Sequence, residues 1–156
     1  MTGKLTGIVL GALMATASAT AAPADHYGVT DLTQMMETLK AKAATSGSAS
    51  VTLATYPNHH TMLAYRTQDG GAELHAKEAD VFTIVRGKAA ILTEGTIEGA
   101  HASGPDEIRG TKVVGGKTTE LKEGDVIHIP AGTPHQMLVS KGNEVLYFVV
   151  KVKEHD

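Results

Sequence analysis

The residues best suited to chemistry lie in one short stretch near the middle of the chain. Glu73, His75 and Lys77 alternate with small or apolar residues, and Asp80 follows at an expected turn. Residues two apart in a β-strand point to the same side, so the three titratable side chains share one strand face. Because buried charges must be paired or bound to a metal, the stretch predicts a site inside the fold. The alternative is an edge strand whose polar face lies in water.

A second stretch, residues 124–135, supplies another imidazole after a Pro-Ala-Gly turn. Two imidazoles, from His75 and His135, and the carboxylate of Asp80 form a donor set that leaves open positions on Fe(II), Mn or a similar ion. In this hypothesis the catalytic residue is Lys77, which faces the same cavity. It either binds an anionic substrate or acts as a base whose pKa is lowered by burial and by the ion.

Lys77 also allows a rival interpretation without a metal. A protonated ammonium has no lone pair, so it cannot be a metal ligand, and its charge opposes a nearby divalent ion. In the rival interpretation, an ion pair between Lys77 and either Asp80 or Glu73 takes the place of the metal. If a metal is bound, Glu73 is a further candidate ligand.

The rest of the chain is dominated by short strand signals separated by turns. Alternating or apolar runs predict strands at 50–56, 62–67, 88–93, 118–121, 125–129, 136–139 and 144–153, in addition to those around the two stretches. One helix is expected from Thr30 or Asp31 up to the small polar residues 45–48. Its apolar stripe is suited to packing on the strands or on a partner subunit: Leu32, Met35, Met36, Leu39 and Ala43. About ten short strands and one helix predict an all-β double-sheet barrel.

Segment 94–116 is long and rich in glycine, and it is expected to be either a lid or surface decoration. Decoration with some ordered strand is the favoured interpretation, because 112–114 alternates. The loop residues His59 and His60 are expected to be solvated. His128 is expected to be a partly buried histidine bonded to a neighbouring strand, so none of the three is placed among the metal ligands.

The two stretches resemble the two motifs of the cupin superfamily. The second motif, G-x5-P-x-G-x2-H-x3-N, fits at Gly124, Pro130, Gly132 and His135, with Val139 in place of the asparagine. The first motif, G-x5-H-x-H-x3-4-E-x6-G, fits in part. With His75 at its first histidine position, Lys77 stands at the second, Asp80 replaces the glutamate and Gly87 closes the motif.

The resemblance implies a double-stranded β-helix or jelly-roll barrel over residues 48–156, with one short N-terminal helix. It also implies a divalent metal (Fe, Mn, Ni or Zn), a small polar molecule bound in the barrel, and a homodimer. The activity would be that of a metal-dependent enzyme of oxygenase, isomerase or lyase type. The alternatives are a metal-free binding or sensing cupin, with Lys77 contacting an anionic ligand, and a structural module whose polar strand face is solvated.

The N-terminus resembles a secretory signal. Residues 1–21 combine Lys4, a moderately apolar core and small-residue cleavage sites, and residues 22–47 would form a linker and the helix. The mature protein would then be secreted or periplasmic, with no stable membrane span. The chain has no cysteine, so an exported form lacks disulfides. A formal net charge of −3 gives no signature of nucleic-acid binding.

Overall fold

The computed structural model describes residues 23–154 and confirms the predicted all-β class. The signal peptide predicted at residues 1–21 lies outside this range and stays a prediction. None of the helical structure within residues 23–154 is long and apolar enough to cross a membrane. The described part contains α1 (Val29–Ala43), β1 (Ser48–Thr55), β2 (His59–Arg66), β3 (Ala72–His75), β4 (Glu78–Thr93), β5 (Thr96–Glu98), β6 (His101–Gly104), β7 (Glu107–Gly110), β8 (Lys112–Val114), β9 (Lys117–Lys122), β10 (Val126–Ile129), β11 (His135–Leu138) and β12 (Val145–Lys153).

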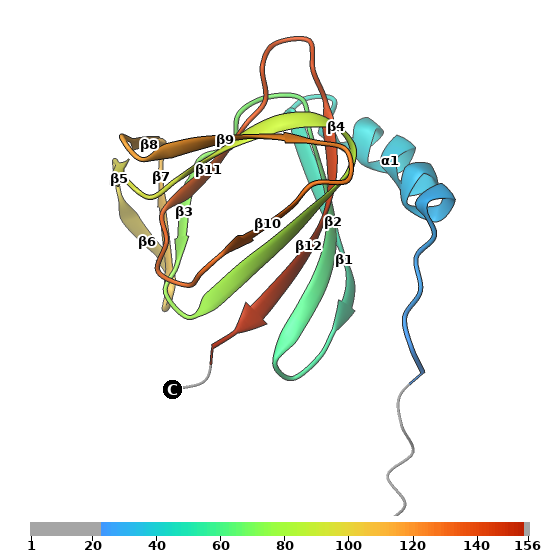
Figure 1. Cartoon of the computed structure of the whole chain (residues 1–156), viewed down its shortest axis with the longest axis horizontal. Helices are drawn as coiled ribbons and strands as arrows, with labels where there is room; N and C mark the ends of the chain where they lie inside the picture. Colours follow the sequence, from blue (N-terminus) through green and yellow to red (C-terminus); the bar gives the residue numbers. More distant parts are fainter. Residues whose placement is uncertain (1–22, 155–156) are drawn as a thin grey trace, which may run out of the picture.

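The long strand β4 joins the two walls of a curled antiparallel sheet (Figure 1). Its first half pairs with β10 and β12, and β12 continues the wall to β2 and β1. Its second half pairs with β9 and β11, and β11 continues to β3, β7 and β6. A single strand shared by both walls fixes their relative position, so side chains from opposite walls can meet in the space between them.

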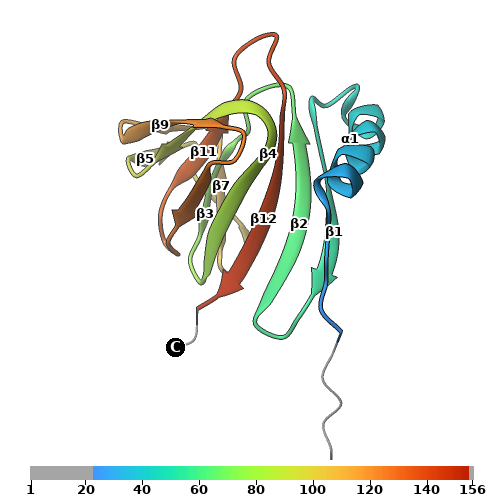
Figure 2. The same cartoon turned by 45° about the vertical axis from the view of Figure 1, so that its right-hand side comes forward.

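Because successive side chains of a strand point to opposite faces, the buried apolar residues form two separate clusters. One fills the space between the walls and includes Phe82, Ile84, Tyr147 and Val149. The other lies outside, where α1 covers the outer face of β1 and β2 (Figure 2). The helical stripe predicted from the sequence packs there against Leu63, with other outward-facing residues of the same wall. The helix therefore packs on its own barrel.

The structure corrects three local expectations. The helix begins at Val29, and Asp31 lies inside its first turn, where its carboxylate accepts the Gly28 N–H at 3.0 Å. Asp80 is not in a turn but within β4, with only 1% of its side chain exposed. Segment 94–116 forms four strands, of which β7 pairs with β3. The segment is therefore part of the barrel wall rather than decoration.

Two motif glycines provide a test of this architecture. Gly87 and Gly124 both adopt a left-handed backbone, with φ of 83° and 89°. A Cβ at Gly87 would collide with the Glu144 carbonyl oxygen of the neighbouring connection, whereas a Cβ at Gly124 would meet open space. We expect Gly124→Ala to lower the free energy of unfolding by about 1–2 kcal/mol, the cost of left-handed backbone. Gly87→Ala should cost clearly more, since it adds a clash with backbone. Urea denaturation of both variants measures the difference, and equal losses would contradict the close approach at Gly87.

Candidate metal centre

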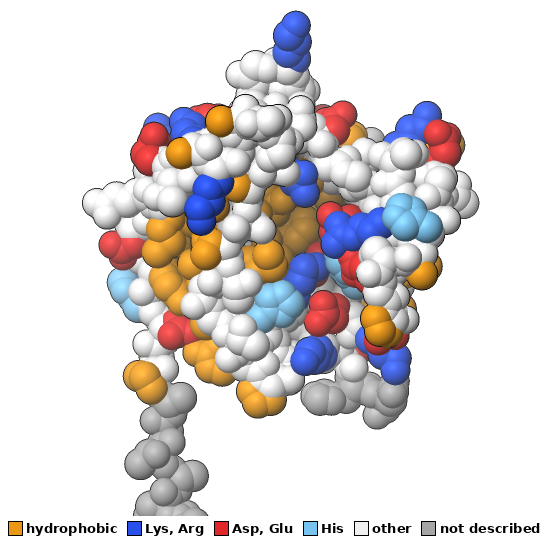
Figure 3. All heavy atoms as spheres, turned by 180° about the vertical axis from the view of Figure 1, so that it is seen from behind, with side chains coloured by type: hydrophobic (Ala, Val, Ile, Leu, Met, Phe, Trp, Pro, Cys, Tyr) orange, Lys and Arg blue, Asp and Glu red, His pale blue; other side chains and the backbone are white. Residues whose placement is uncertain are grey.

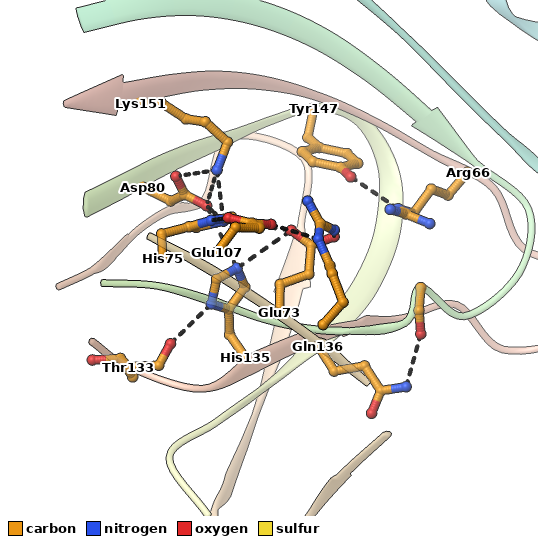
Figure 4. A network of polar contacts seen from close by, with 12 residues as sticks. Arg66, Glu73, His75, Asp80, Glu107, Thr133, His135, Gln136, Tyr147 and Lys151 are labelled. Atoms are coloured by element: carbon orange, nitrogen blue, oxygen red, sulfur yellow. Dashed lines mark hydrogen bonds and ion pairs between the residues drawn. The ribbon is translucent and has the colours of Figure 1, made fainter. Parts of the chain in front are cut away.

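Four strands bring their polar side chains to one point between the walls (Figure 4). Glu73 and His75 lie on β3, on the same face of the strand, as the sequence alternation predicted. Asp80 comes from β4, His135 from the start of β11, and Lys151 from β12. His75, Asp80 and His135 are buried, with 5%, 1% and 4% of each residue exposed. The convergence of these three side chains, expected from the two sequence stretches, is observed.

Backbone hydrogen bonds hold the two stretches together. The Gly132 N–H, in the turn that precedes β11, donates to the His75 carbonyl at 2.7 Å. The buried side chain of Gln136 accepts the Val113 N–H at 2.9 Å and donates to the Gly70 carbonyl at 2.8 Å. Gln136 thus fastens segment 94–116 and the entry to β3 onto β11. These bonds position both imidazoles before any ligand arrives.

The hydrogen bonds of the two imidazoles orient them toward a common point. His135 Nδ1 lies 3.0 Å from the Thr133 carbonyl oxygen, which can only accept, so Nδ1 carries the proton. His75 Nδ1 bonds to the carboxylate of Glu107, which fixes the same tautomer. In the neutral rings, both Nε2 atoms therefore present lone pairs to the cluster. Such pairing of the distal nitrogen with a carbonyl or carboxylate is typical of histidines that bind metals.

Two carboxylates face these lone pairs. Asp80 Oδ2 lies 3.3 Å from His75 Nε2 and 3.5 Å from His135 Nε2. Glu73 Oε2 lies 3.5 Å and 3.9 Å from the same two atoms. One ligand atom each from Glu73, His75 and His135 lies within 4.8 Å of the others, a spacing that permits a shared ion. Asp80 lies outside this group of three, but its Oδ2 is within 3.5 Å of both Nε2 atoms.

The lysine in the cluster is Lys151. Its Nζ lies 2.7 Å from His75 Nε2, and 2.7 Å and 2.9 Å from the two carboxylate oxygens of Asp80. The ammonium thus compensates a carboxylate that is almost fully buried. Tyr147 and Val149 precede Lys151 at spacings of two on β12 and face the interior. Lys151 continues this alternation, so the period of the strand would have identified it.

The structure corrects the expectation that Lys77 faces the cavity. Strand β3 ends at His75, so the alternation does not continue to Lys77. Lys77 is exposed in the bend between β3 and β4, where its carbonyl accepts the Glu154 N–H at 2.9 Å. The position assigned to Lys77 in the sequence hypothesis is taken by a lysine on another strand.

Segment 94–116 adds two charged residues to the site that the sequence did not single out as functional. Arg109 on β7 pairs with Glu73 Oε1 through Nη1 and with Glu107 Oε1 through Nε, both at 2.5 Å. Glu107 in turn bonds to His75 Nδ1. The signal was the cluster of charges in this segment, but its pairing with β3 could not be inferred without the register of the sheet.

The carboxylates of the cluster stabilise positive charge. Burial opposes ionisation of Glu73, but its hydrogen bond to His75 and the charge of Arg109 lower its pKa to about 2. Burial likewise opposes ionisation of Asp80, yet His135, His75 and Lys151 hold its pKa well below the usual range. For His75, burial lowers the pKa, but hydrogen bonding to Asp80 and Glu73 raises it to about 10. The Lys151 ammonium can donate to His75 Nε2 only while that nitrogen is unprotonated. A protonated His75 and the Lys151 ammonium are therefore alternative cations that compete for the same carboxylates.

The remaining histidines singled out in the sequence lie elsewhere. His59 bonds to the Asn58 side chain at 2.8 Å and stacks on Tyr56, away from the four strands of the cluster. His60 is half-buried at the start of β2. His128, expected to be partly buried, is exposed on β10.

Comparison with known proteins identifies similar folds and a family model that matches part of the chain. A family model described as "Cupin domain" matches residues 109–151. The fold is similar to that of KdgF from Halomonas sp. (TM-score 0.52, 15% identity, 71% of this chain and 83% of that chain), and of TT1209 from Thermus thermophilus (0.53, 14%, 71% and 88%). It is also similar to the cupin domain of Cnp3 from Schizosaccharomyces pombe (0.52, 12%, 69% and 65%). No curated protein matches the sequence. The chain therefore has the fold of the cupin proteins, and the part of it that matches the cupin family model is residues 109–151.

With the cupin fold in place, the first motif can be aligned on the structure. Placing Glu73 at the first histidine position and His75 at the second leaves four residues before Asp80 and six before Gly87. Both spacings are those of the motif. With Lys77 at the second position, only two residues would precede Asp80 where the motif has three or four. The four cupin ligand positions are then Glu73, His75, Asp80 and His135, and Lys77 occupies none of them.

The donor set fits a divalent ion. His135 Nε2 is buried and has no hydrogen-bond partner among the described residues, although its lone pair points into the cluster. A buried polar atom without a partner is costly, and a metal ion at this point would satisfy it. Two imidazoles and two carboxylates are ligands that Mn, Fe and Zn accept.

The dependence of stability on pH below neutrality tests the charge balance of the metal-free protein. A carboxylate with a lowered pKa stabilises the fold above its unfolded pKa, and the effect is lost as the pH falls. For Glu73 the loss should fall between pH 4.5 and about pH 2 and amount to about 3 kcal/mol. Glu73→Gln should therefore flatten the dependence of unfolding free energy on pH in this window. Urea denaturation from pH 2 to 7 measures it, with the exposed Glu120→Gln on β9 as the charge-matched control. Parallel profiles for Glu73→Gln and wild type would contradict the assignment.

Proposed function

We propose that the chain is a metal-dependent cupin that binds one divalent first-row ion and a small polar anion inside its barrel. The ion would be held by His75, His135, Glu73 and Asp80. The observation that supports this most directly is His135 Nε2, a buried nitrogen that makes no hydrogen bond among residues 23–154 and that faces Asp80 at 3.5 Å and Glu73 at 3.9 Å, while Nδ1 is held by the Thr133 carbonyl. The second imidazole is held in the same way by Glu107. Both rings thus aim Nε2 at their common point, where a metal would replace the proton that Asp80 and Glu73 favour on His75.

When bound, such an ion supplies Lewis acidity and open coordination positions for a small ligand. The chain's own residues provide the rest of the site. Glu107 and the Thr133 carbonyl hold the imidazole rings in place, while Arg109 orients Glu73 through its 2.5 Å contact. The surrounding apolar cluster, with Phe82 at 6.3 Å from the His135 ring centroid, excludes water from this side of the cluster. The proposed activity is oxygenase, isomerase or lyase chemistry on a small polar molecule.

The proposed ligand is an anion because of Arg66. Arg66 follows Met62 and Ala64 on the inward face of β2, and its Nε donates to the Tyr147 hydroxyl at 3.0 Å. Within the described residues, no carboxylate lies in ion-pair distance of its guanidinium, whose terminal nitrogens remain available. Figure 4 places Arg66 on the far side of the Tyr147 ring from Lys151. A carboxylate or phosphate group between the ion and Arg66 would satisfy both.

One face of the molecule is hollowed. Figure 3 shows a hollow with hydrophobic side chains at its depth and with charged and histidine side chains gathered around it. A mainly apolar wall with a few polar groups is typical of sites that bind small molecules.

A metal-free binding cupin is the second candidate function. The observation in its favour is the Lys151 ammonium, which bonds to His75 and to both oxygens of Asp80 without any metal. In this alternative Lys151, rather than Lys77, takes the role of the resident cation, and the ligand binds to Arg66 alone. Metal content decides between the two candidates.

Export and self-association complete the proposal. Residues 1–21 have the composition of a cleavable signal, which supports a secreted or periplasmic protein. The homodimer implied by the resemblance also stays a proposal. Neither is needed for the arrangement of the site.

Removal of one imidazole tests the metal. We expect the wild-type protein to bind one equivalent of Mn²⁺, Fe²⁺ or Zn²⁺, and His135→Ala to lose roughly hundredfold or more in affinity. The matched control is His128→Ala, an exposed histidine seven residues earlier that should retain wild-type affinity. Isothermal titration and metal analysis of the purified protein measure the effect. A folded His135→Ala protein with full metal content would refute the proposed site.

Removal of the Arg66 guanidinium tests the anion. We expect small dicarboxylates or inorganic phosphate to raise the Tm of the metal-loaded wild-type protein, and Arg66→Met to weaken this response at least tenfold, because a charged hydrogen bond is worth about 1.5–3 kcal/mol. Arg86→Met, an exposed arginine on β4, is the control. A thermal-shift titration measures the response. Equal responses of wild type and Arg66→Met would exclude Arg66 as the anion contact.

A further inference from the structure

We propose that Lys151 is an internal competitor for the metal, so that loading of the ion requires the Lys151 ammonium to leave the cluster. The inference rests on the proposed metal function and concerns the regulation of the same site. It would make the affinity of this cupin for metals lower than its donor set alone permits.

The geometry places the ammonium at the position of an ion. Lys151 Nζ lies within 2.9 Å of His75 Nε2 and of both Asp80 oxygens, which are three of the atoms a metal would use. Metal–ligand bonds to nitrogen and oxygen are about 2.0–2.2 Å long, so an ion and the ammonium cannot occupy this point together. Lys151 leaves one donor unused, since His135 Nε2 stays without a partner among the described residues. The ammonium therefore fills the site incompletely.

The charge balance explains why a cation is always needed. Glu73, Asp80 and Glu107 bring three carboxylates, and Glu73 and Glu107 share the single positive charge of Arg109 through its two contacts. The remaining compensation for Asp80 comes from Lys151 at 2.7 Å. Removal of the ammonium without replacement would leave a buried carboxylate poorly compensated, which is strongly destabilising. An incoming divalent ion supplies that charge and one more, so with neutral imidazoles the exchange brings the three carboxylates and Arg109 from a deficit of one positive charge to neutrality.

The side chain has a route out of the cluster. The side chain of Lys151 is 16% exposed while that of Asp80 is 1% exposed, so part of the lysine side chain already contacts solvent. Lysine can keep its aliphatic stem along an apolar surface while its ammonium moves into water. Two residues further along β12, Lys153 is exposed and its Nζ reaches the Pro57 carbonyl oxygen at 3.4 Å. Lys153 shares strand, charge and length with Lys151 but lies outside the cluster, which makes it the matched control.

The deciding experiment compares metal affinity in the full chain at fixed pH. Zn²⁺ and Mn²⁺ are titrated separately into wild type, Lys151→Met, Lys151→Gln and Lys153→Met by calorimetry. We expect at least ~tenfold tighter binding for Lys151→Met, because a like charge near the ion is removed, and no change for Lys153→Met. Lys151→Gln keeps a hydrogen-bond donor for Asp80 and should bind metal more tightly than wild type even if metal-free Lys151→Met unfolds.

Amine labelling gives an independent measurement on the wild-type protein. Lys151 should react slowly with an acylating reagent in the metal-free form and faster after addition of Zn²⁺, as read by peptide mass spectrometry. Lys153 in the same peptide region provides the internal reference. Unchanged Lys151 reactivity on saturation with Zn²⁺ would overturn the inference.

The outcomes separate this inference from the proposed function. Metal binding by wild type with equal or weaker binding by both Lys151 variants overturns the inference and leaves the proposed function in place. Binding by the variants but not by wild type supports the inference and contradicts a metal function for the natural chain. No binding by any variant contradicts both.

Discussion

The structure depends on the compensation of one buried carboxylate. Asp80 is 1% exposed in the strand that joins both walls of the barrel. Moving a charge out of water costs several kcal/mol unless partners surround it, so the side chains that reach the Asp80 carboxylate must bring positive charge or hydrogen-bond donors. β3 and β11 bring imidazoles, and β12 brings an ammonium. The polar cluster and the barrel are therefore one structural unit.

The outer elements of the site follow from the same constraint. The ring nitrogens that face away from Asp80 need acceptors, and these come from the Thr133 carbonyl in the turn before β11 and from Glu107 on β7. Glu107 then requires compensation, which Arg109 on the same strand supplies. Segment 94–116 thus has a chemical reason to pair with β3. Its removal would free the His75 ring and expose the carboxylates beside it.

Much of the fold and half of the site could be predicted from the sequence. Alternation and turn residues indicated the strands, and the spacing from Gly124 to His135 identified one imidazole and the turn that positions it. Lys77 was misplaced because alternation was extended beyond the end of β3. Lys151 was missed although Tyr147 and Val149 share its face, because a lysine near a strand end is usually solvated. Arg109 and Glu107 depend on a pairing between β3 and β7 that no local pattern encodes.

The nature of the resident cation determines what this barrel can do. An ammonium donates hydrogen bonds but accepts no ligand, so with Lys151 in the cluster the site can orient an anion only through peripheral groups such as Arg66. A divalent ion accepts lone pairs from the imidazoles and still has positions for a ligand. Both cations satisfy Asp80, and the same strands position both. His135 distinguishes them, because its buried Nε2 makes no hydrogen bond to Lys151 and lies 3.5 Å from Asp80 Oδ2, whereas a metal at the common point would bind it directly. The sequence therefore retains an imidazole that the lysine alone does not use, and this is the physical argument for a metal in the barrel.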